Sequence, residues 1–143
     1  YQFATQVNVE LSKVSLPMLE RFKEEIGVDP LYRQCGYFIV LTDPSDVDRF
    51  KSSLELQHNL GVQTEWLEGD EVRRRLPLMK FEDAIAATLH HKDGLADPSS
   101  VNMGYLDRGR DLGASILMET EALGIEVSGS RVSGVKTNRG DIS

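Results

Sequence analysis

Two Asp-Pro joints constrain the fold of this chain most strongly. The sequence reads Thr42-Asp43-Pro44-Ser45 at the first joint and Ala96-Asp97-Pro98-Ser99 at the second. An aspartate before a helix accepts hydrogen bonds from free amides, and proline in the first turn loses no bond because its nitrogen would be unpaired anyway. Each joint therefore predicts a helix that follows an extended segment. We attribute their similarity to shared capping chemistry rather than to an internal repeat.

The first third of the chain has a helical pattern followed by a strand pattern. Apolar residues recur at helical spacing over 8–26 and predict one buried face, formed by Val14, Met18, Leu19, Phe22 and Ile26. Pro17 interrupts the pattern, so the helix either kinks there, which we favour, or begins near Ser15. Gly27 is typical of a helix end. Residues 36–42 are aromatic and β-branched and predict a strand covered on both faces.

The middle third alternates between short helices and strands. A helix is expected from Asp43 or Thr42 to Gly61, with Val47, Phe50 and Leu54 as its apolar stripe. Strands are expected at 63–67 and 84–91. Between them, Asp70 is expected to cap a brief helix that Pro77 ends.

The last third predicts one long helix and a β-meander. The helix spans 97–113, with Val101, Tyr105, Leu106 and Leu112 expected to be buried. Gly104 and Gly109 lower helix stability by roughly 1 kcal/mol each, so we expect another backbone to pack closely there. Strands are expected at 115–120, 122–128 and 131–137, with turns at 128–130 and 138–140. The fold class is α+β.

The amino-acid composition limits the classes of partner and the cellular location that we expect for this chain. A net charge of −7 argues against nucleic acid or an anionic membrane surface as the main partner. Cys35 is the single cysteine, so a disulfide framework and a thiolate zinc site are excluded, and a reducing, cytoplasmic location is expected. The sequence lacks an 18-residue apolar run, so we expect no membrane span.

The sequence alone indicates no catalytic residue and no metal site. No G-x-G-x-x-G loop follows a predicted strand. His90, His91 and Asp93 are candidate metal ligands, but adjacent histidines on a strand point to opposite faces, so we interpret them as a strand end. Other candidates have simpler structural interpretations: Cys35 as a small strand-edge residue, Arg73-Arg74-Arg75 and His58 as solvated helix residues, Ser99 and Ser100 as serines outside any nucleophile elbow, and Arg139-Gly140-Asp141 as a turn.

Several segments, in order, resemble one enzyme family. They are "FATQVNVELSKVSLPMLERFKEEIGVDPLYRQCGYFIVLT" at 3–42, "QHNLGVQTEWLEGDEVRRRLP" at 57–77, "DGLADPSSV" at 93–101, "GYLDRGRDLGA" at 104–114 and a V-x-G-V-x-T-x-x-G-x-I hairpin at 132–142. The chain resembles the FAD-dependent amine and amino-acid oxidoreductases, the group of glycine and sarcosine oxidases, D-amino-acid dehydrogenase and the proline dehydrogenase β-subunit. The resemblance covers essentially the whole chain.

The resemblance implies that three segments of the chain belong to different parts of the enzyme. Residues 1–27 would be a helix that links the flavin and substrate regions, 28–92 part of a mainly antiparallel substrate-domain sheet, and 93–143 part of the FAD domain. It implies one flavin contact, made by the main chain of Ala122 at the adenine end of FAD. A covalent flavin at the "ADPSSV" position is not expected, because Pro98 and Ser99 stand there.

The resemblance also implies a function for a longer parent protein. We expect this chain to be its middle segment, inactive alone, with the pyrophosphate-binding loop outside it. The parent would oxidise the C–N bond of a small amine or amino acid such as sarcosine, glycine or proline. Two alternatives remain: a flavoenzyme acting on a hydroxy acid or glycerol phosphate, and a non-enzymatic assembly module. An unfinished sheet predicts self-association of this segment.

Overall fold

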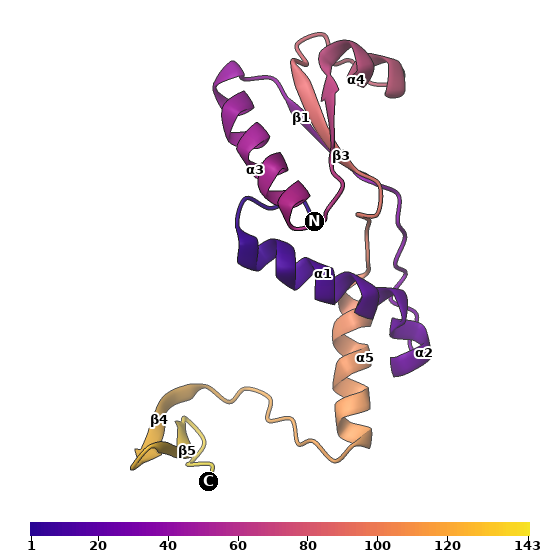
Figure 1. Cartoon of the computed structure of the whole chain (residues 1–143). Helices are drawn as coiled ribbons and strands as arrows, with labels where there is room; N and C mark the ends of the chain where they lie inside the picture. The colour runs from indigo at the N-terminus through magenta and orange to yellow at the C-terminus, as the bar shows by residue number, and fades with distance from the viewer. The chain divides into compact units, whose positions relative to one another are not determined.

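The computed structural model describes residues 1–143 (Figure 1). The chain divides into two compact units, Tyr1–Tyr105 and Leu106–Ser143, with the boundary inside the last helix. The elements are, in order, α1 (Gln6–Glu20), α2 (Phe22–Ile26), β1 (Tyr37–Leu41), the 3₁₀ helix η1 (Pro44–Asp46), α3 (Val47–Asn59), β2 (Glu65–Glu68), α4 (Gly69–Arg75), β3 (Ala86–His90), α5 (Pro98–Asp111), β4 (Ala122–Ser128) and β5 (Arg131–Thr137). None of the helices combines the length and hydrophobicity that a membrane crossing needs.

The first unit is built around a three-stranded antiparallel sheet in the order β1-β3-β2. The central strand β3 is buried at every position, although its alanines have low strand propensity. The predicted strands at 36–42, 63–67 and 84–91 are therefore confirmed with slightly different bounds. The antiparallel pairing confirms the expected α+β class.

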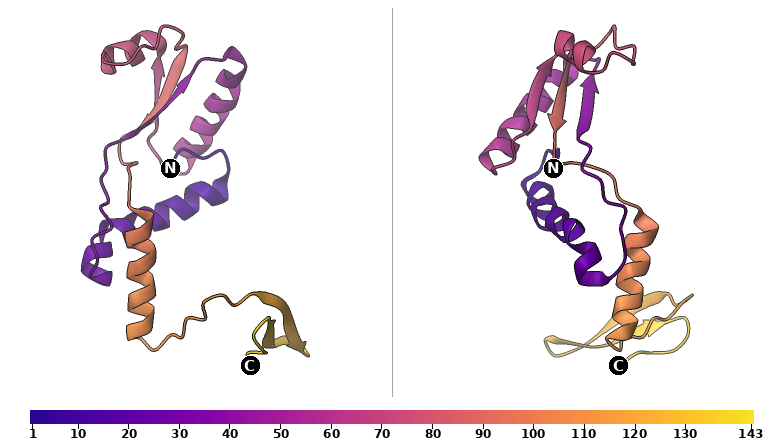
Figure 2. Two further views of the ribbon diagram at one scale, coloured as in Figure 1. Left: turned by 180° about the vertical axis from the view of Figure 1, so that it is seen from behind. Right: turned by 90° about the vertical axis from the view of Figure 1, so that its right-hand side faces the viewer.

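Each face of this sheet is covered by a different helix. Thr88 lies between Ile39 and Trp66, and the α3 residue Lys51 places its Nζ 5.3 Å from the Trp66 ring centroid. Figures 1 and 2 show α3 running alongside the sheet. The opposite face holds the apolar core of Leu67, Val72, Ala84, Ala87 and Leu89, in which Val72 comes from α4. The prediction that 36–42 is covered on both faces is only partly correct, because the middle of β1 is half-buried and Tyr37 at its start is exposed.

The segments that enter and leave the sheet pair with each other. Arg33 and Leu95 exchange two main-chain hydrogen bonds of 2.9 and 3.0 Å, Gly36 N donates to Asp93 O, and Asp97 N donates to Pro30 O. A Cβ on Gly94 would lie 1.9 Å from the carbonyl oxygen of Arg33, so only glycine fits this approach. This ladder accounts for the Asp93-Gly94 pair of the "DGLADPSSV" segment.

The first helix is long, as favoured, and includes Pro17. It is interrupted at Arg21 rather than at the proline, and α2 ends at Gly27, which has a φ of 90°. The predicted buried face is only partly correct. Phe22 is buried, but Val14 is 63% and Met18 39% exposed. The packed side of α1 instead runs through Val9, which is fully buried, and Lys13, whose ammonium donates to Leu60 O.

Helix α4 corrects the expected role of Asp70. The helix begins at Gly69, with Glu68 in the N-cap position, and Asp70 lies inside the first turn, where it pairs with Arg73. The start of α4 is fixed instead by the close approach of Gly69 to the segment before β3. A Cβ on Gly69 would lie 2.1 Å from Ala84 O, so the backbones pack tightly at this point.

Helix α5 begins as predicted. The Asp97 carboxylate accepts hydrogen bonds from the amide and the hydroxyl of Ser100. At Gly104 it is a side chain, the Phe22 ring, that packs closely rather than another backbone. The predicted buried face is wrong at two positions, because Tyr105 is 44% and Leu112 74% exposed. Gly113, with a φ of 89°, ends the helical segment.

The second unit contains the β4–β5 hairpin. Both strands match their predicted ranges, and the turns at 128–130 and 138–140 each contain a glycine with positive φ. The predicted strand at 115–120 does not form. Glu119 has a φ of 52°, which interrupts an extended backbone. Next to it, the amide of Glu121 donates a hydrogen bond to the side-chain oxygen Oδ1 of Asn138. Ile142 forms an isolated antiparallel bridge with Val135.

Candidate functional site

Ala122, the one predicted cofactor contact, is the first residue of β4. Its Cα is paired with that of Thr137, and a register shift follows between Ala122 and Gly124. A β-bulge at such a position leaves the extra residue outside the ladder and turns the strand. Ala122 is exposed at the point where the strand begins.

A cleft of about 390 Å³ lies beside this strand start within the second unit. It is formed by the segment before β4 and by the turn after β5, and its lining residues are Ile116, Leu117, Met118, Thr120, Thr137, Arg139, Gly140, Asp141 and Ile142. Arg139 is held by Glu119 at 2.8 Å. The lining residues combine apolar with polar side chains. They do not provide the consecutive glycine amides that a pyrophosphate needs.

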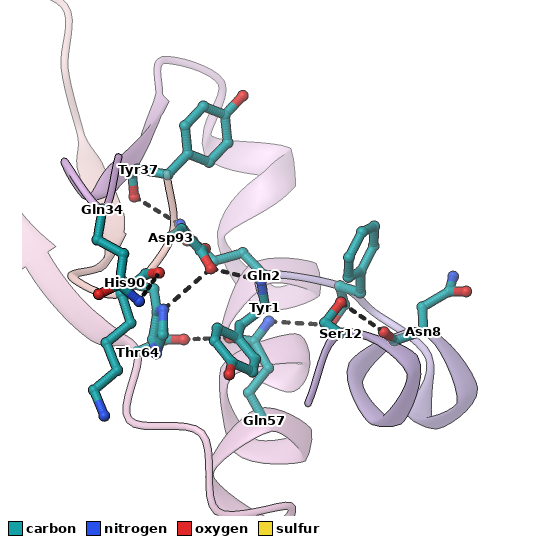
Figure 3. A network of polar contacts seen from close by, with 12 residues as sticks. Tyr1, Gln2, Asn8, Ser12, Gln34, Tyr37, Gln57, Thr64, His90 and Asp93 are labelled. Atoms are coloured by element: carbon teal, nitrogen blue, oxygen red, sulfur yellow. Dashed lines mark hydrogen bonds and ion pairs between the residues drawn. The ribbon is translucent and has the colours of Figure 1, made fainter. Parts of the chain in front are cut away.

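The first unit contains a buried polar network around Asp93 (Figure 3). One carboxylate oxygen of Asp93 lies 2.8 Å from the main-chain nitrogen of Tyr1 and 3.2 Å from His90 Nδ1. The Tyr1 ring packs edge-on against the His90 imidazole, with centroids 4.6 Å apart. Burial lowers the pKa of His90, although the nearby Asp93 carboxylate acts in the opposite direction. Asp93 therefore lies between residue 1 and the end of β3.

A second group of buried polar side chains continues from the same segment into α3 (Figure 3). Gln57 donates to Phe3 O at 3.0 Å and accepts from the Thr64 hydroxyl at 2.6 Å. His58 lies 2.7 Å from Thr64 O through Nε2, so it has a specific main-chain partner although it is exposed as expected. Sequence reasoning missed the buried role of Gln57. The signal was its position three residues after Leu54, on the apolar stripe of the helix.

A cleft of about 520 Å³ lies beside the Asp93 network in the first unit. It is bounded by residues 1–3, by one side of α1, by Tyr37 and Ile39 of β1, and by residues 93–95. Tyr37, Leu11 and Leu95 are each more than half exposed, which makes the opening apolar. The cleft can accept an apolar group next to the Asp93 carboxylate. Sequence reasoning did not identify it, because its walls are far apart in the chain.

The remaining sequence candidates are held in separate local contacts. His91 lies 2.6 Å from Glu65, whereas His90 contacts Asp93, so the two histidines point to different partners as predicted. Cys35 is free and exposed. The three arginines at 73–75 are exposed and paired with acids of α4 and β2, which confirms a solvated helix face. Ser100 belongs to the α5 cap.

Comparison with known proteins places both units in one family. Residues 2–143 match the family described as FAD dependent oxidoreductase (DAO). The sarcosine oxidase subunit beta of Rhodobacter capsulatus is 26% identical over 129 residues, which cover 87% of this chain and 31% of the relative.

Solved structures agree with the sequence match. The L-proline dehydrogenase of P. horikoshii is 33% identical with a TM-score of 0.79, over 99% of this chain and 37% of that one. The glycine oxidase of Bacillus cereus is 26% identical with a TM-score of 0.70, over 94% of this chain and 37% of that one. The chain thus spans about a third of the length of the relatives it matches. With a family match over residues 2–143, the chain belongs to the DAO family of FAD-dependent oxidoreductases.

Proposed function

We propose that this chain is the middle part of an FAD-dependent enzyme that oxidises the C–N bond of a small amine or amino acid. The observation that carries the proposal is the extent of the similarity, which runs through residues 2–143 and includes both units. The relatives are named for sarcosine, L-proline and glycine, and each of these carries an amine next to a carbon bound to a carboxylate. When bound, the flavin would supply the redox chemistry by accepting a hydride equivalent from a carbon attached to the amine nitrogen.

We assign the three segments of the chain as the resemblance implies. Residues 1–27 form the connecting helix, 28–92 belong to the substrate-binding domain, and 93–143 belong to the FAD domain. The ladder between 30–36 and 93–97 supports this division, because it brings together the points where the chain enters and leaves the sheet. The main chain of Ala122 is the proposed contact to the adenine end of FAD. A reducing, cytoplasmic location is proposed from the sequence alone, which contains the single cysteine Cys35.

Flavin reduction tests the reaction type. The protein translated from the complete reading frame is purified with FAD and mixed, without oxygen, with sarcosine, glycine or L-proline. Bleaching of the oxidised flavin absorbance by at least one of these amines is the expected result. Glycerol 3-phosphate and lactate serve as the comparison substrates. Bleaching by those compounds alone would overturn the amine assignment in favour of a hydroxy-acid or glycerol-phosphate enzyme.

The same preparation tests the non-enzymatic alternative. A protein that retains a yellow, FAD-loaded spectrum after gel filtration is a flavoprotein, as proposed. A colourless protein that does not take up added FAD would reject the proposal and favour an assembly module.

A further inference from the structure

A small cavity between α3 and the sheet contains two buried polar atoms without a protein partner. The cavity has a volume of about 110 Å³ and is lined by Gln2, Ala4, Ile39, Arg49, Phe50, Ser53, Gln57 and Thr88. The two atoms are Thr88 Oγ1 and Gln2 Oε1. Thr88 is only 4% exposed and stands at the centre of β3, so its hydroxyl cannot turn to bulk solvent.

The other polar groups of the cavity wall already have partners. Gln2 Nε2 donates to Tyr37 O at 2.6 Å, which orients the amide so that its oxygen remains free. The Ser53 hydroxyl donates to Arg49 O, and Gln57 bonds to Phe3 O and Thr64. Arg49, also in the wall, donates to the Asp46 carboxylate. The buried side-chain atoms of this cavity that have no partner at all are therefore one hydroxyl oxygen and one amide oxygen.

An unpaired buried polar group destabilises a fold, so such groups are normally satisfied by protein or by ordered water. A water molecule needs roughly 10–15 Å³ of cavity volume and two to four polar partners. The cavity exceeds the volume requirement, and Thr88 and Gln2 supply two partners. Ser53 Oγ, which already donates, retains lone pairs and supplies a third.

We propose that this cavity is a binding site for ordered water that joins Gln2 to the central strand through Thr88. The water donates to Gln2 Oε1 and accepts from, or donates to, the Thr88 hydroxyl. It thereby attaches the segment before α1 to the middle of the sheet, on the face that α3 covers. This inference concerns the fold of the first unit and does not depend on the proposed reaction.

Substitution of Thr88 by valine should change the urea midpoint in opposite directions, depending on whether the cavity holds a water molecule or is dry. If water satisfies the hydroxyl, Thr88→Val removes one of its partners and lowers the urea midpoint of the chain. If the hydroxyl is unpaired in a dry cavity, the same change removes an unsatisfied group and raises the midpoint. A raised or unchanged midpoint overturns the proposal.

Two matched variants calibrate the measurement. Thr64→Val removes an equally buried hydroxyl whose partner is Gln57 at 2.6 Å, so its midpoint should fall whatever the cavity holds. Thr88→Ser keeps the hydroxyl and should retain the bound water. A high-resolution crystal structure of the unsubstituted chain gives a direct answer independent of every variant: density within hydrogen-bond distance of Thr88 Oγ1 and Gln2 Oε1 supports the site, and a featureless cavity overturns it.

Discussion

The ring of Phe22 packs directly against the main chain of Gly104. A Cβ at residue 104 would lie 2.8 Å from Phe22 Cε1 and 3.2 Å from Ile26 Cγ2. Phe22 is 1% exposed and also makes an edge-on contact with Tyr105, with centroids 4.9 Å apart, so its ring has no free space to move into. The contact between α2 and α5 therefore depends on the absence of a side chain at residue 104.

Gly104→Ala should lower the free energy of unfolding by about 1–3 kcal/mol, because the added methyl group overpacks this contact. Gly109→Ala is the matched control on the same helix. Its Cβ would meet only Ala114 Cβ at 3.7 Å, an ordinary contact. Alanine should raise stability there by about 0.5–1 kcal/mol. Urea unfolding of both variants measures these two opposite changes in the free energy of unfolding. Stabilisation by both substitutions would contradict the packing argument.

The Asp97 cap should make stability sensitive to acid. Hydrogen bonds from the hydroxyl and the amide of Ser100 lower the pKa of Asp97 below its ordinary value of 3.8. Because the folded pKa is the lower one, this contribution is fully present above pH 3.8 and is lost as the pH falls through the folded pKa. Asp97→Asn keeps a capping oxygen, so it should preserve stability at neutral pH and reduce the loss in acid.

Thermal unfolding as a function of pH measures this effect. Asp97→Ala provides the comparison, because it removes the cap and should lower stability at every pH. An asparagine variant with the same acid-induced loss as the unsubstituted chain would show that Asp97 is not the titrating group.

The contact between His91 and Glu65 should be visible in a carboxyl titration. His91, at 2.6 Å, is the largest cause of the lowered pKa of Glu65, and Arg75, at 3.0 Å, adds to it. His91→Ala should therefore raise the pKa of Glu65 towards its ordinary value of 4.5. The Glu65 side-chain carbonyl shift, followed by NMR, measures the change. His58→Ala is the control, since His58 contacts the main chain of Thr64, and an equal shift there would contradict the assignment.

Two substitutions at Ala122 distinguish a main-chain contact to adenine from a side-chain contact. In the FAD-loaded parent protein, Ala122→Val keeps every main-chain atom and should leave FAD affinity nearly unchanged. Ala122→Pro removes the main-chain N–H and restricts φ, so it should weaken FAD binding about tenfold, the equivalent of one neutral hydrogen bond. Calorimetric titration of the flavin-free protein measures both. Equal affinities for the two variants would reject the main-chain contact.

The β4–β5 hairpin should promote self-association of the 143-residue chain. Leu123, Ile125 and Val127 alternate along β4, and each is more than 60% exposed; Val132 of β5 is 67% exposed. Alternating residues share one face of a strand, and exposed apolar strands pair readily with other copies. Sedimentation should show species heavier than a monomer, and Ile125→Lys should reduce them. Ser128→Lys, which adds the same charge at an exposed position next to Val127 on the opposite face of β4, is the control. A purely monomeric unsubstituted chain would contradict the prediction.

The local features of this fold could be predicted from the sequence, because short-range chemistry determines them. The capped start of α5 at Asp97 depends only on neighbouring residues, and so do the glycine turns of the hairpin. The strand 36–42 was similarly clear from its composition. The family resemblance, which rests on ordered segments, was confirmed over residues 2–143.

The sequence-based predictions were wrong where contacts between residues far apart in the chain determine which residues are buried or paired. Val14 lies on the apolar stripe of its helix, but α1 packs through Val9 and Lys13 because the neighbouring partner is the end of α3. The segment 115–120 has a strand-like composition, yet no strand pairs with it and Glu119 adopts a positive φ. The Asp93 network could not be predicted either, because it joins residues 92 positions apart. The contact at Ala122 stays a prediction.

The ladder between 30–36 and 93–97 makes the sheet of the first unit a topological insertion. The chain leaves at Gly36 and returns at Asp93, and those two residues are joined by a hydrogen bond of 2.9 Å. The segment 37–92 therefore begins and ends beside this hydrogen bond. In evolution, such an insertion can lengthen, shorten or be exchanged without changing the path from α2 to α5. In protein engineering, residues 37–92 mark a segment that a short turn could replace while its flanking helices keep their connection.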